Sequence, residues 1–255
     1  MKIISIINLK GGVAKTITAY NMAHILASVH KQRVLIIDND KQGNTSKMFG
    51  YHDYSLKTIA DVLTDKNPDI IDAIIPTSYE GIHVIPANMN LLRANMDILL
   101  DVGRPQQRRL EKAMLPIAGE YDYCIIDNAP DINMSVINSL VVTNDVIVPI
   151  KVDKYAFDGL DILRGQIEDI KDFNPNIRFA GCLITMYQKN NVNIQGEAWL
   201  KSQSQYPIFD TYIRRTTKID ETTFNGEAII KYAPKCTAAK DYIAFVEEYL
   251  SKSKM

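Results

Sequence analysis

The chain has 255 residues, of which 46% are hydrophobic and 23% are charged, and its net charge is −1. This is the balance of an ordinary globular protein that is long enough to bury a sizeable core. A protein that coats DNA through its bulk charge would be basic, so any nucleic-acid binding here requires a local patch.

Short apolar runs alternate along the chain with segments of helical period. In chain order, strands are expected at 3–7, 34–37, 82–85, 123–126, 146–150, 179–184 and 208–212. Helices are expected from residue 14 onward and near 91–100, 107–117, 158–173 and 238–250. The polar stretch 53–75 is expected to form a peripheral helical insertion. Because buried strands alternate with helices, we predict an α/β fold with a mostly parallel, twisted sheet covered by helices on both faces.

The cysteines and the lengths of the apolar runs argue against several classes of protein. Cys124, Cys182 and Cys236 are widely spaced and predict neither a disulfide framework nor a zinc site. There is no signal-peptide pattern, and no run approaches the roughly 18 apolar residues of a membrane-spanning helix. We find no repeat and no linker rich in Pro, Gly or Ser. We therefore expect a cytoplasmic protein in which residues 1–255 form a single domain.

A glycine-rich segment follows the first expected strand and opens the first expected helix, which is the context of a phosphate-binding loop. It reads Asn8-Leu9-Lys10-Gly11-Gly12-Val13-Ala14-Lys15-Thr16. Amides of the turn and of the helix start, as far as Ile17, can point at phosphate oxygens. Lys15 can neutralise β/γ-phosphate charge, and the Thr16 hydroxyl can ligate Mg²⁺. The strict pattern G-x-x-x-x-G-K-[ST] is not met, so this motif alone leaves a glycine-rich turn without nucleotide as an alternative.

Carboxylates follow two of the expected strands. Asp38 and Asp40 end the second strand, and Asp127 ends the strand that begins at Tyr123. In an open α/β sheet the carboxyl ends of the strands lie on the ligand side. Asp127 matches the Walker B arrangement, in which an aspartate holds Mg²⁺ directly or through water. The alternative for Asp38 and Asp40 is a pair of turn-forming residues.

Taken together, these three segments resemble the ParA/MinD family of deviant Walker A P-loop ATPases, whose loop reads K-G-G-x-x-K-[ST]. The resemblance is nearest to ParA/Soj-type partition ATPases without an N-terminal helix-turn-helix extension, so specific operator binding is not expected. It implies that Lys10 reaches across a sandwich dimer to the partner's nucleotide. It also implies that Asp40 orients or activates the attacking water and that Asp38 supports the Mg²⁺ shell.

The sequence departs from the family pattern at four positions: Ala14 replaces a glycine, Lys41 and Arg214 replace prolines, and Ala129 stands in the usual D-x-P-P segment. If residue 14 needs a positive φ, its alanine costs about 1 kcal/mol and turnover is slowed. If φ is negative, the change is harmless.

The resemblance continues through the second half of the chain. Segment 155–160 looks like the one after the family's fourth core strand, and segment 183–187 like its base-binding side. Segment 213–221 resembles the family's I-P-R-x-x-R-x-x-E pattern. These likenesses imply that Met186 and Arg214 contact the adenine. They also imply non-specific DNA binding by basic residues of this region, for which we name Arg215, Lys218 and Lys235.

The expected function is therefore ATP-dependent DNA partitioning. An ATP-driven homodimer with Mg²⁺ would bind DNA non-specifically, associate with the nucleoid, and be released when a ParB-like DNA-binding partner stimulates hydrolysis. A MinD-like membrane-cycling ATPase and a metabolic ligase on the same fold are the alternatives. No membrane partner is expected, because the apolar face of segment 241–250 is expected to pack on the core and its two glutamates disfavour an anionic bilayer.

Overall fold

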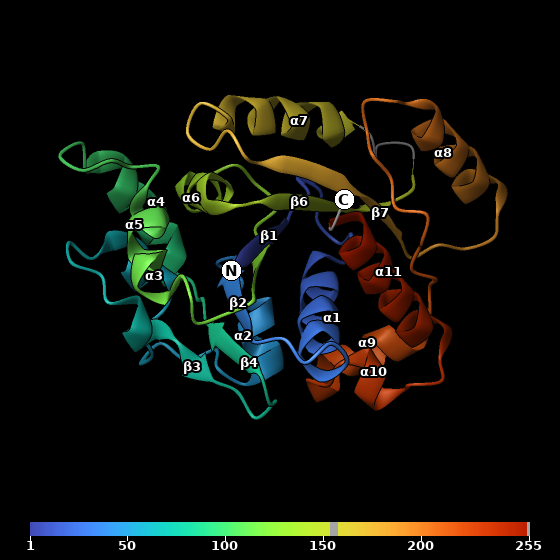
Figure 1. Ribbon diagram of the computed structural model, residues 1–255, viewed down its shortest axis with the longest axis horizontal. Coiled ribbons are helices and arrows are strands. Elements are labelled where there is room, and N and C mark those ends of the chain that lie inside the picture. Colours follow the sequence, from blue (N-terminus) through green and yellow to red (C-terminus); the bar gives the residue numbers. More distant parts are fainter. Residues whose placement is uncertain (154–157, 254–255) are drawn as a thin grey trace.

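The computed structural model of the protein describes residues 1–153 and 158–253. Within these residues the chain forms a seven-stranded sheet in the order β3-β4-β2-β5-β1-β6-β7 (Figure 1). All neighbouring strands run parallel except β3, which pairs antiparallel with β4. The strands are β1 (Lys2–Ile6), β2 (Val34–Asn39), β3 (Ile75–Pro76), β4 (Ile82–Ile85), β5 (Tyr123–Asn128), β6 (Asp145–Lys151) and β7 (Arg178–Thr185). This arrangement confirms the predicted α/β class.

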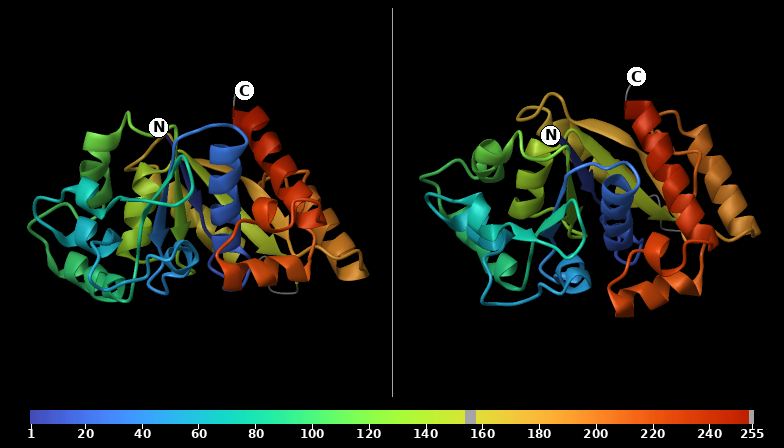
Figure 2. Two further views of the ribbon diagram at one scale, coloured as in Figure 1. Left: turned by 90° about the horizontal axis from the view of Figure 1, so that it is seen from below. Right: turned by 60° about the horizontal axis from the view of Figure 1, so that its bottom comes forward.

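Helices cover both faces of the sheet, because alternate side chains of each strand point into different cores. Ile4, Ile36 and Ile125 face α1, α10 and α11, whereas Leu35 and Cys124 face α3, α4 and α5 (Figures 1 and 2). A third cluster packs α6 and α7 against β6 and β7. The helices are α1 (Lys15–Ser28), α2 (Asn44–Phe49), α3 (Ile59–Thr64), α4 (Asn90–Leu100), α5 (Arg109–Met114), α6 (Met134–Val142), α7 (Asp158–Ile170), α8 (Asn191–Ser202), α9 (Thr217–Asn225), α10 (Ile229–Tyr232) and α11 (Thr237–Ser253), with short 3₁₀ turns η1 (Ile70–Ala73) and η2 (Leu115–Ile117).

The strand predicted at 208–212 is wrong. This segment runs along the outer edge of β7, where the Phe209 amide donates to Cys182 O (3.0 Å) and the Ile213 amide donates to Ile184 O (2.8 Å). Ile208 makes only an isolated bridge to Cys182. Pro207, which has no N–H to donate, precedes the segment, and a regular ladder does not form.

The stretch 53–75 is more deeply integrated than the expected peripheral insertion. Its α3 and η1 bury Ile59, Leu63 and Ile70 almost completely against the sheet. Thr58 and Asp61 form a reciprocal capping box at the start of α3. Polar residues dominate this segment and lie around a buried apolar stripe. Because of the high polar content, the apolar stripe was not recognised from the sequence.

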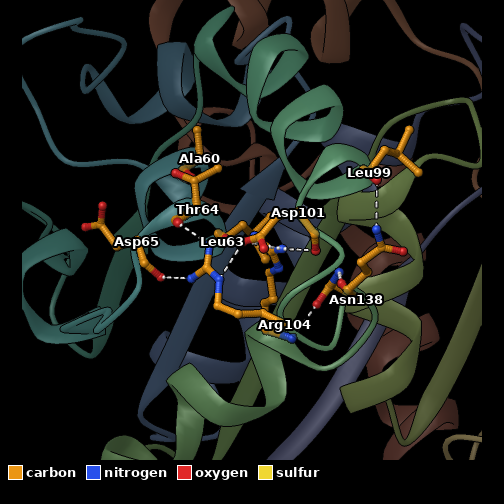
Figure 3. A network of polar contacts seen from close by, with 10 residues as sticks. Ala60, Leu63, Thr64, Asp65, Leu99, Asp101, Arg104 and Asn138 are labelled. Carbon is orange, nitrogen blue, oxygen red and sulfur yellow. Dashed lines mark hydrogen bonds and ion pairs between the residues drawn. The ribbon is translucent and has the colours of Figure 1, made fainter.

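The far end of α3 is fastened by an arginine from a distant loop. Figure 3 shows the Arg104 guanidinium beside the last carbonyls of α3, where it donates to Thr64 O (2.8 Å) and to Asp65 O (2.7 Å). The same guanidinium donates to the Asp101 carboxylate at 2.6 Å. A cation at a helix C-terminus satisfies free carbonyls and opposes the helix dipole, so Arg104 stabilises both α3 and the 101–108 loop.

The C-terminal helix packs on the core, as predicted. Tyr242, Phe245 and Tyr249 of α11 are fully buried, and α11 lies beside α1 in every view (Figures 1 and 2). The Tyr249 hydroxyl donates to the buried carboxylate of Asp145 at 2.7 Å. Among the residues described here, no helix combines the length and the apolar character that crossing a bilayer requires.

Candidate nucleotide site

A loop that is anchored on both flanks joins β1 to α1 at the carboxyl edge of the sheet. The Asn8 side chain holds its start, donating to Pro149 O (2.8 Å) and accepting from the Lys10 amide (2.9 Å). The Thr185 hydroxyl holds its far side by donating to Val13 O at 3.1 Å. Contacts to β6 and to the end of β7 therefore fix the loop from both flanks.

Ala14 adopts the left-handed conformation, with φ 65° and ψ 31°, at the N-cap of α1. The steric cost anticipated for an alanine at this position is therefore present. Gly12 also has a positive φ, of 70°, but a glycine adopts it without strain. Ile17 contributes only its backbone to the helix start, because its side chain packs towards Tyr20 and Met48.

Lys15 begins α1 and is only 8% exposed. Its ammonium donates to Lys10 O at 3.1 Å, which folds the side chain back over the loop. Burial lowers the pKa of Lys15, and the nearby carboxylates of Asp127, Asp40 and Asp131 oppose that shift. The first turn of α1 holds no acidic residue, so the positive end of its dipole is not neutralised within the helix. A buried lysine and an open helix N-terminus together favour a bound anion.

Lys10 lies at the outer rim of the loop. Its side chain is 36% exposed and forms an ion pair with Asp153, which follows β6. The ammonium is therefore held by a residue of its own chain. From this position at the rim, Lys10 can exchange Asp153 for another partner without unfolding of the loop.

Asp127, at the end of β5, is the buried carboxylate nearest the loop. Burial raises the pKa of Asp127, while hydrogen bonding by Thr16 and Thr45 lowers it in part. The Thr45 hydroxyl donates to Oδ2 at 2.8 Å, and Oδ1 is buried with no hydrogen-bond partner among the described residues. An orphaned carboxylate oxygen beside a threonine hydroxyl fits Mg²⁺, which takes one or two protein oxygens and completes its shell with phosphates and water.

Asp38 is engaged within its own loop. Its Oδ2 accepts the Ser46 amide (2.8 Å) and the Ser46 hydroxyl (2.6 Å), and its Oδ1 accepts the Asp40 amide (3.2 Å). Burial, and then the neighbouring charge of Asp127, raise the pKa of Asp38. The carboxylate anchors the start of α2, which carries Thr45. Through Thr45 it could support the Mg²⁺ shell, as the resemblance implies, and that role stays a prediction.

Asp40 is more accessible than the two buried carboxylates. Its Oδ1 accepts the Gln42 amide at 2.9 Å, and its carbonyl accepts the Gly43 amide at 2.9 Å, which closes a tight turn. The carboxylate is thus held at the open side of the loop, where a water could reach it. This is the position that general-base or water-orienting chemistry requires.

The residues predicted to contact adenine surround one small cavity of about 160 Å³, which is lined by Ala14, Thr185, Met186 and Arg214 among others. Met186 has a positive φ of 53° at the end of β7. The Arg214 guanidinium is committed to Asp241 through bonds of 2.6–3.2 Å. Arg214 therefore shapes the wall of the cavity, and its charge is not free to meet a base.

The three predicted DNA-binding residues differ in availability. The Lys218 ammonium is paired with Glu221 at 2.8 Å and lies over the Tyr232 ring. Arg215 and Lys235 are exposed, and neither has an ion pair within residues 1–153 and 158–253. Lys218 is thus the least available of the three. Tyr155, Ala156 and Phe157, which also carried the resemblance, lie outside the described residues.

Three residues at this site escaped the sequence analysis: Thr45, Asp131 and Asp153. Asn8 was named there only as the first residue of the glycine-rich segment, without a role. Thr45 closely follows the carboxylates of β2, so its position was available as a signal. Asp131 and Asp153 meet the loop only through folding, because their partners are distant in the chain. The closeness of Asp131 to Asp127 in the sequence places it at the same edge of the sheet, but no sequence spacing reveals its partner or that of Asp153.

The comparisons with known proteins agree with this geometry. Residues 1–179 match the AAA domain family. The sporulation initiation inhibitor protein Soj of Bacillus subtilis is 33% identical over 250 residues, which cover 97% of this chain and 97% of that protein. The chromosome partitioning protein ParA of Caulobacter vibrioides is 31% identical over 259 residues, covering 100% of this chain and 96% of that protein.

Solved structures show the same fold. The cobyrinic acid a,c-diamide synthase of Mycobacterium smegmatis with bound ADP and magnesium has a TM-score of 0.85 at 26% identity, over 99% of this chain and 95% of that chain. The cell division ATPase MinD of Pyrococcus furiosus has a TM-score of 0.80 at 21% identity, over 98% of each chain. With a matched family over most of its length and similar relatives over nearly all of it, the chain belongs to the ParA/MinD family of P-loop ATPases.

Proposed function

We propose that this ATPase partitions DNA. ATP and Mg²⁺ bind at the phosphate loop, and two ATP-bound copies pair with their loops facing. The dimer holds DNA non-specifically and so associates with the nucleoid, until a ParB-like DNA-binding partner stimulates hydrolysis. The observation that carries this proposal is the likeness over the whole chain to Soj and to proteins named for chromosome partitioning.

The chemistry is phosphoryl transfer to water, which depends on positioning and charge neutralisation. Lys15 and the loop amides from Gly11 to Ile17 would hold the β- and γ-phosphates. Thr16 and Asp127 would hold Mg²⁺, which supplies further neutralisation of phosphate charge when it is bound. Asp40 would orient the attacking water from the open side of the loop.

Lys10 supplies the link between ATP and the dimer. Its side chain is partly exposed, and its ammonium is held by Asp153 of the same chain. On release from Asp153 it would reach the nucleotide of the second copy. Hydrolysis and dimerisation would then depend on the same side chain.

DNA contact falls to the exposed cations beyond β7. Arg215 and Lys235 are the leading candidates, whereas Lys218 would have to exchange its exposed ion pair with Glu221 for a DNA phosphate. Contacts of this kind reach phosphates, carry no sequence information and weaken with salt. With an overall charge of −1 the protein has no bulk positive charge to add to a patch, and two patches brought together in a dimer would bind DNA more tightly than one.

The test is binding of non-specific double-stranded DNA without nucleotide, with ADP and with ATP, at low and moderate salt. We expect binding with ATP alone, weakened by salt, and a clear loss in the variant Arg215→Glu/Lys235→Glu. The control is Lys171→Glu, a charge reversal just beyond α7 at a lysine that is paired with Glu168. An ATP-dependent dimer that ignores DNA would overturn the partition proposal.

A metabolic ligase is the second candidate, because the cobyrinic acid a,c-diamide synthase structure aligns with nearly the whole chain. An enzyme of that kind would hydrolyse ATP in response to a carboxylate substrate and an ammonia donor, and would ignore DNA. A MinD-like membrane cycle finds less support, since the apolar face of α11 is occupied by Tyr242, Phe245 and Tyr249 packing on the core. Flotation with anionic liposomes and ATP would test it directly.

A further inference from the structure

An ion pair connects the two acidic loops that flank the phosphate loop. Lys41 Nζ lies 3.6 Å from Asp131 Oδ2, and both side chains are partly exposed. Lys41 follows Asp40 directly, and Asp131 lies four residues beyond Asp127. Because β2 and β5 are neighbours, with Asp38 opposite Asp127, the pair bridges loops that leave adjacent strands at the same edge.

Both partners are held in place by their surroundings. The turn that carries Lys41 is closed by the Gly43 amide, which donates to Asp40 O at 2.9 Å. The other oxygen of Asp131 accepts the Asn133 side-chain amide at 2.7 Å, and Asn133 in turn caps α6. The position of the Asp131 carboxylate is therefore set by α6 and does not depend on Lys41.

The charge of Asp131 reaches the phosphate loop. Together with Asp127 and Asp40, it acts on the buried ammonium of Lys15. Asp127 pairs with Ile6, the last residue of β1, so the loop that carries Asp131 leaves the sheet beside the phosphate loop. A carboxylate without a counter-ion beside the phosphate loop repels an incoming polyphosphate. Lys41 is the cation that lies against Asp131.

We propose that Lys41 neutralises Asp131 and thereby allows the polyphosphate of the nucleotide to bind, as a positioning residue that the family pattern does not contain. The proposal rests on the ATP site proposed above and is independent of the DNA role. An unscreened charge near a polyphosphate at intermediate dielectric predicts that loss of Lys41 weakens ATP binding about three- to tenfold. The effect should grow with phosphate charge, from AMP through ADP to ATP.

A purely mechanical role for this ion pair makes a different prediction. Partly exposed pairs contribute little stability, and a simple connection between loops is broken equally by removing either partner. If Lys41 only ties the loops together, Lys41→Met and Asp131→Asn behave alike. If it neutralises charge, the two variants differ: Lys41→Met weakens ATP binding, Asp131→Asn does not, and the double variant recovers the affinity of the unaltered protein.

The experiment measures dissociation constants for AMP, ADP and ATP with Mg²⁺ by calorimetric titration of the full chain. The variants are Lys41→Met, Asp131→Asn, the double variant and Lys41→Arg, which should retain affinity. Lys41→Pro is a second way to remove the cation, since residue 41 is the second position of the turn, where proline is favoured. Arg93→Met on α4, which removes an exposed ion pair with Asp97, is the matched control.

Three results would overturn the proposal. One is a parallel loss of affinity in Lys41→Met and Asp131→Asn. Another is a loss in Lys41→Met that Asp131→Asn does not restore, which would indicate direct contact of Lys41 with phosphate. A third is unchanged, tight ATP binding by Lys41→Met, which would refute the proposed role of Lys41 and leave the ATP site intact. Failure of the unaltered protein to bind ATP is a separate outcome, and it would refute the ATP site itself.

Discussion

The left-handed alanine of the phosphate loop can be relieved by one substitution, Ala14→Gly. An L-residue in this region carries a cost of about 1–2 kcal/mol that a glycine does not. Glycine also raises the conformational entropy of the unfolded chain, which offsets about 0.4–1 kcal/mol of the stabilisation gained by removing this cost. Glycine is also a better N-cap than alanine, and Ala14 makes no side-chain cap bond at α1. We therefore expect a net stabilisation of about 0.5–1 kcal/mol.

For a chain of 255 residues this corresponds to a rise in Tm of about 1–4 °C. Thermal melts followed by calorimetry, without nucleotide and with excess Mg-ATP, would measure it. Lys31→Gly is the matched control, because Lys31 is an exposed residue with φ 57° beyond the opposite end of α1. Both variants should be stabilised in both melts, since the strain belongs to the fold.

Nucleotide affinity provides the second readout. If the loop keeps one conformation with and without ATP, Ala14→Gly changes the dissociation constant by less than about twofold, because the strain cancels between the two states. A lower Tm for Ala14→Gly beside a higher Tm for Lys31→Gly would refute the reasoning. That outcome would mean that residue 14 does not hold the left-handed conformation in solution.

Three further substitutions test the roles of individual residues. Asp40→Ala should bind ATP but fail to hydrolyse it, trapping the dimer on DNA, and normal phosphate release would remove Asp40 from the mechanism. Lys10→Ala should bind nucleotide as a monomer, and an ATP-dependent dimer in light scattering would contradict the cross-dimer role. Gly43→Ala should cost more than about 2 kcal/mol in urea unfolding, because φ is +64° and a Cβ would lie 2.7 Å from Ala87 O. Gly50→Ala is its control, with φ +80° and open space around the Cβ, and an equal cost for both would exclude the steric contribution.

The fold was largely predictable because its central strands are short apolar runs buried on both faces. The predicted runs that begin at Ile3, Val34, Tyr123 and Val146 all became strands of the parallel sheet. Helices α2, α6, α8, α9 and α10 were not predicted. Helix α6 is apolar around most of its circumference, with Met134, Val136 and Leu140 all buried, so it shows no amphipathic period to detect.

The residues of the phosphate loop could be named from the sequence because they are contiguous in the chain. Most ion pairs could not be predicted in this way, because their partners are far apart in the sequence. Arg214 is neutralised by Asp241, 27 residues away, and Lys10 by Asp153, 143 residues away. These partners meet only because β6, β7 and α11 bring them to one edge of the sheet. The pair between Lys218 and Glu221 is different, since a spacing of three on a helix predicts contact. The ion pair between Lys218 and Glu221 could therefore have been anticipated from the sequence, and it makes Lys218 a weaker candidate for a DNA contact.

The acidic edge of the sheet also bears on which form of the nucleotide is bound. Asp40 and Asp127 both act on the ammonium of Lys15, and one oxygen of Asp127 has no partner among the described residues. Bare ATP would meet repulsion from these carboxylates, whereas the magnesium complex carries less negative charge and gives the orphaned oxygen a partner. We therefore expect ATP affinity to fall at least about tenfold when EDTA replaces Mg²⁺ in a calorimetric titration. Asp127→Asn should remove much of that dependence. Equal affinity of the unaltered protein in both buffers would indicate that these carboxylates do not face the phosphates.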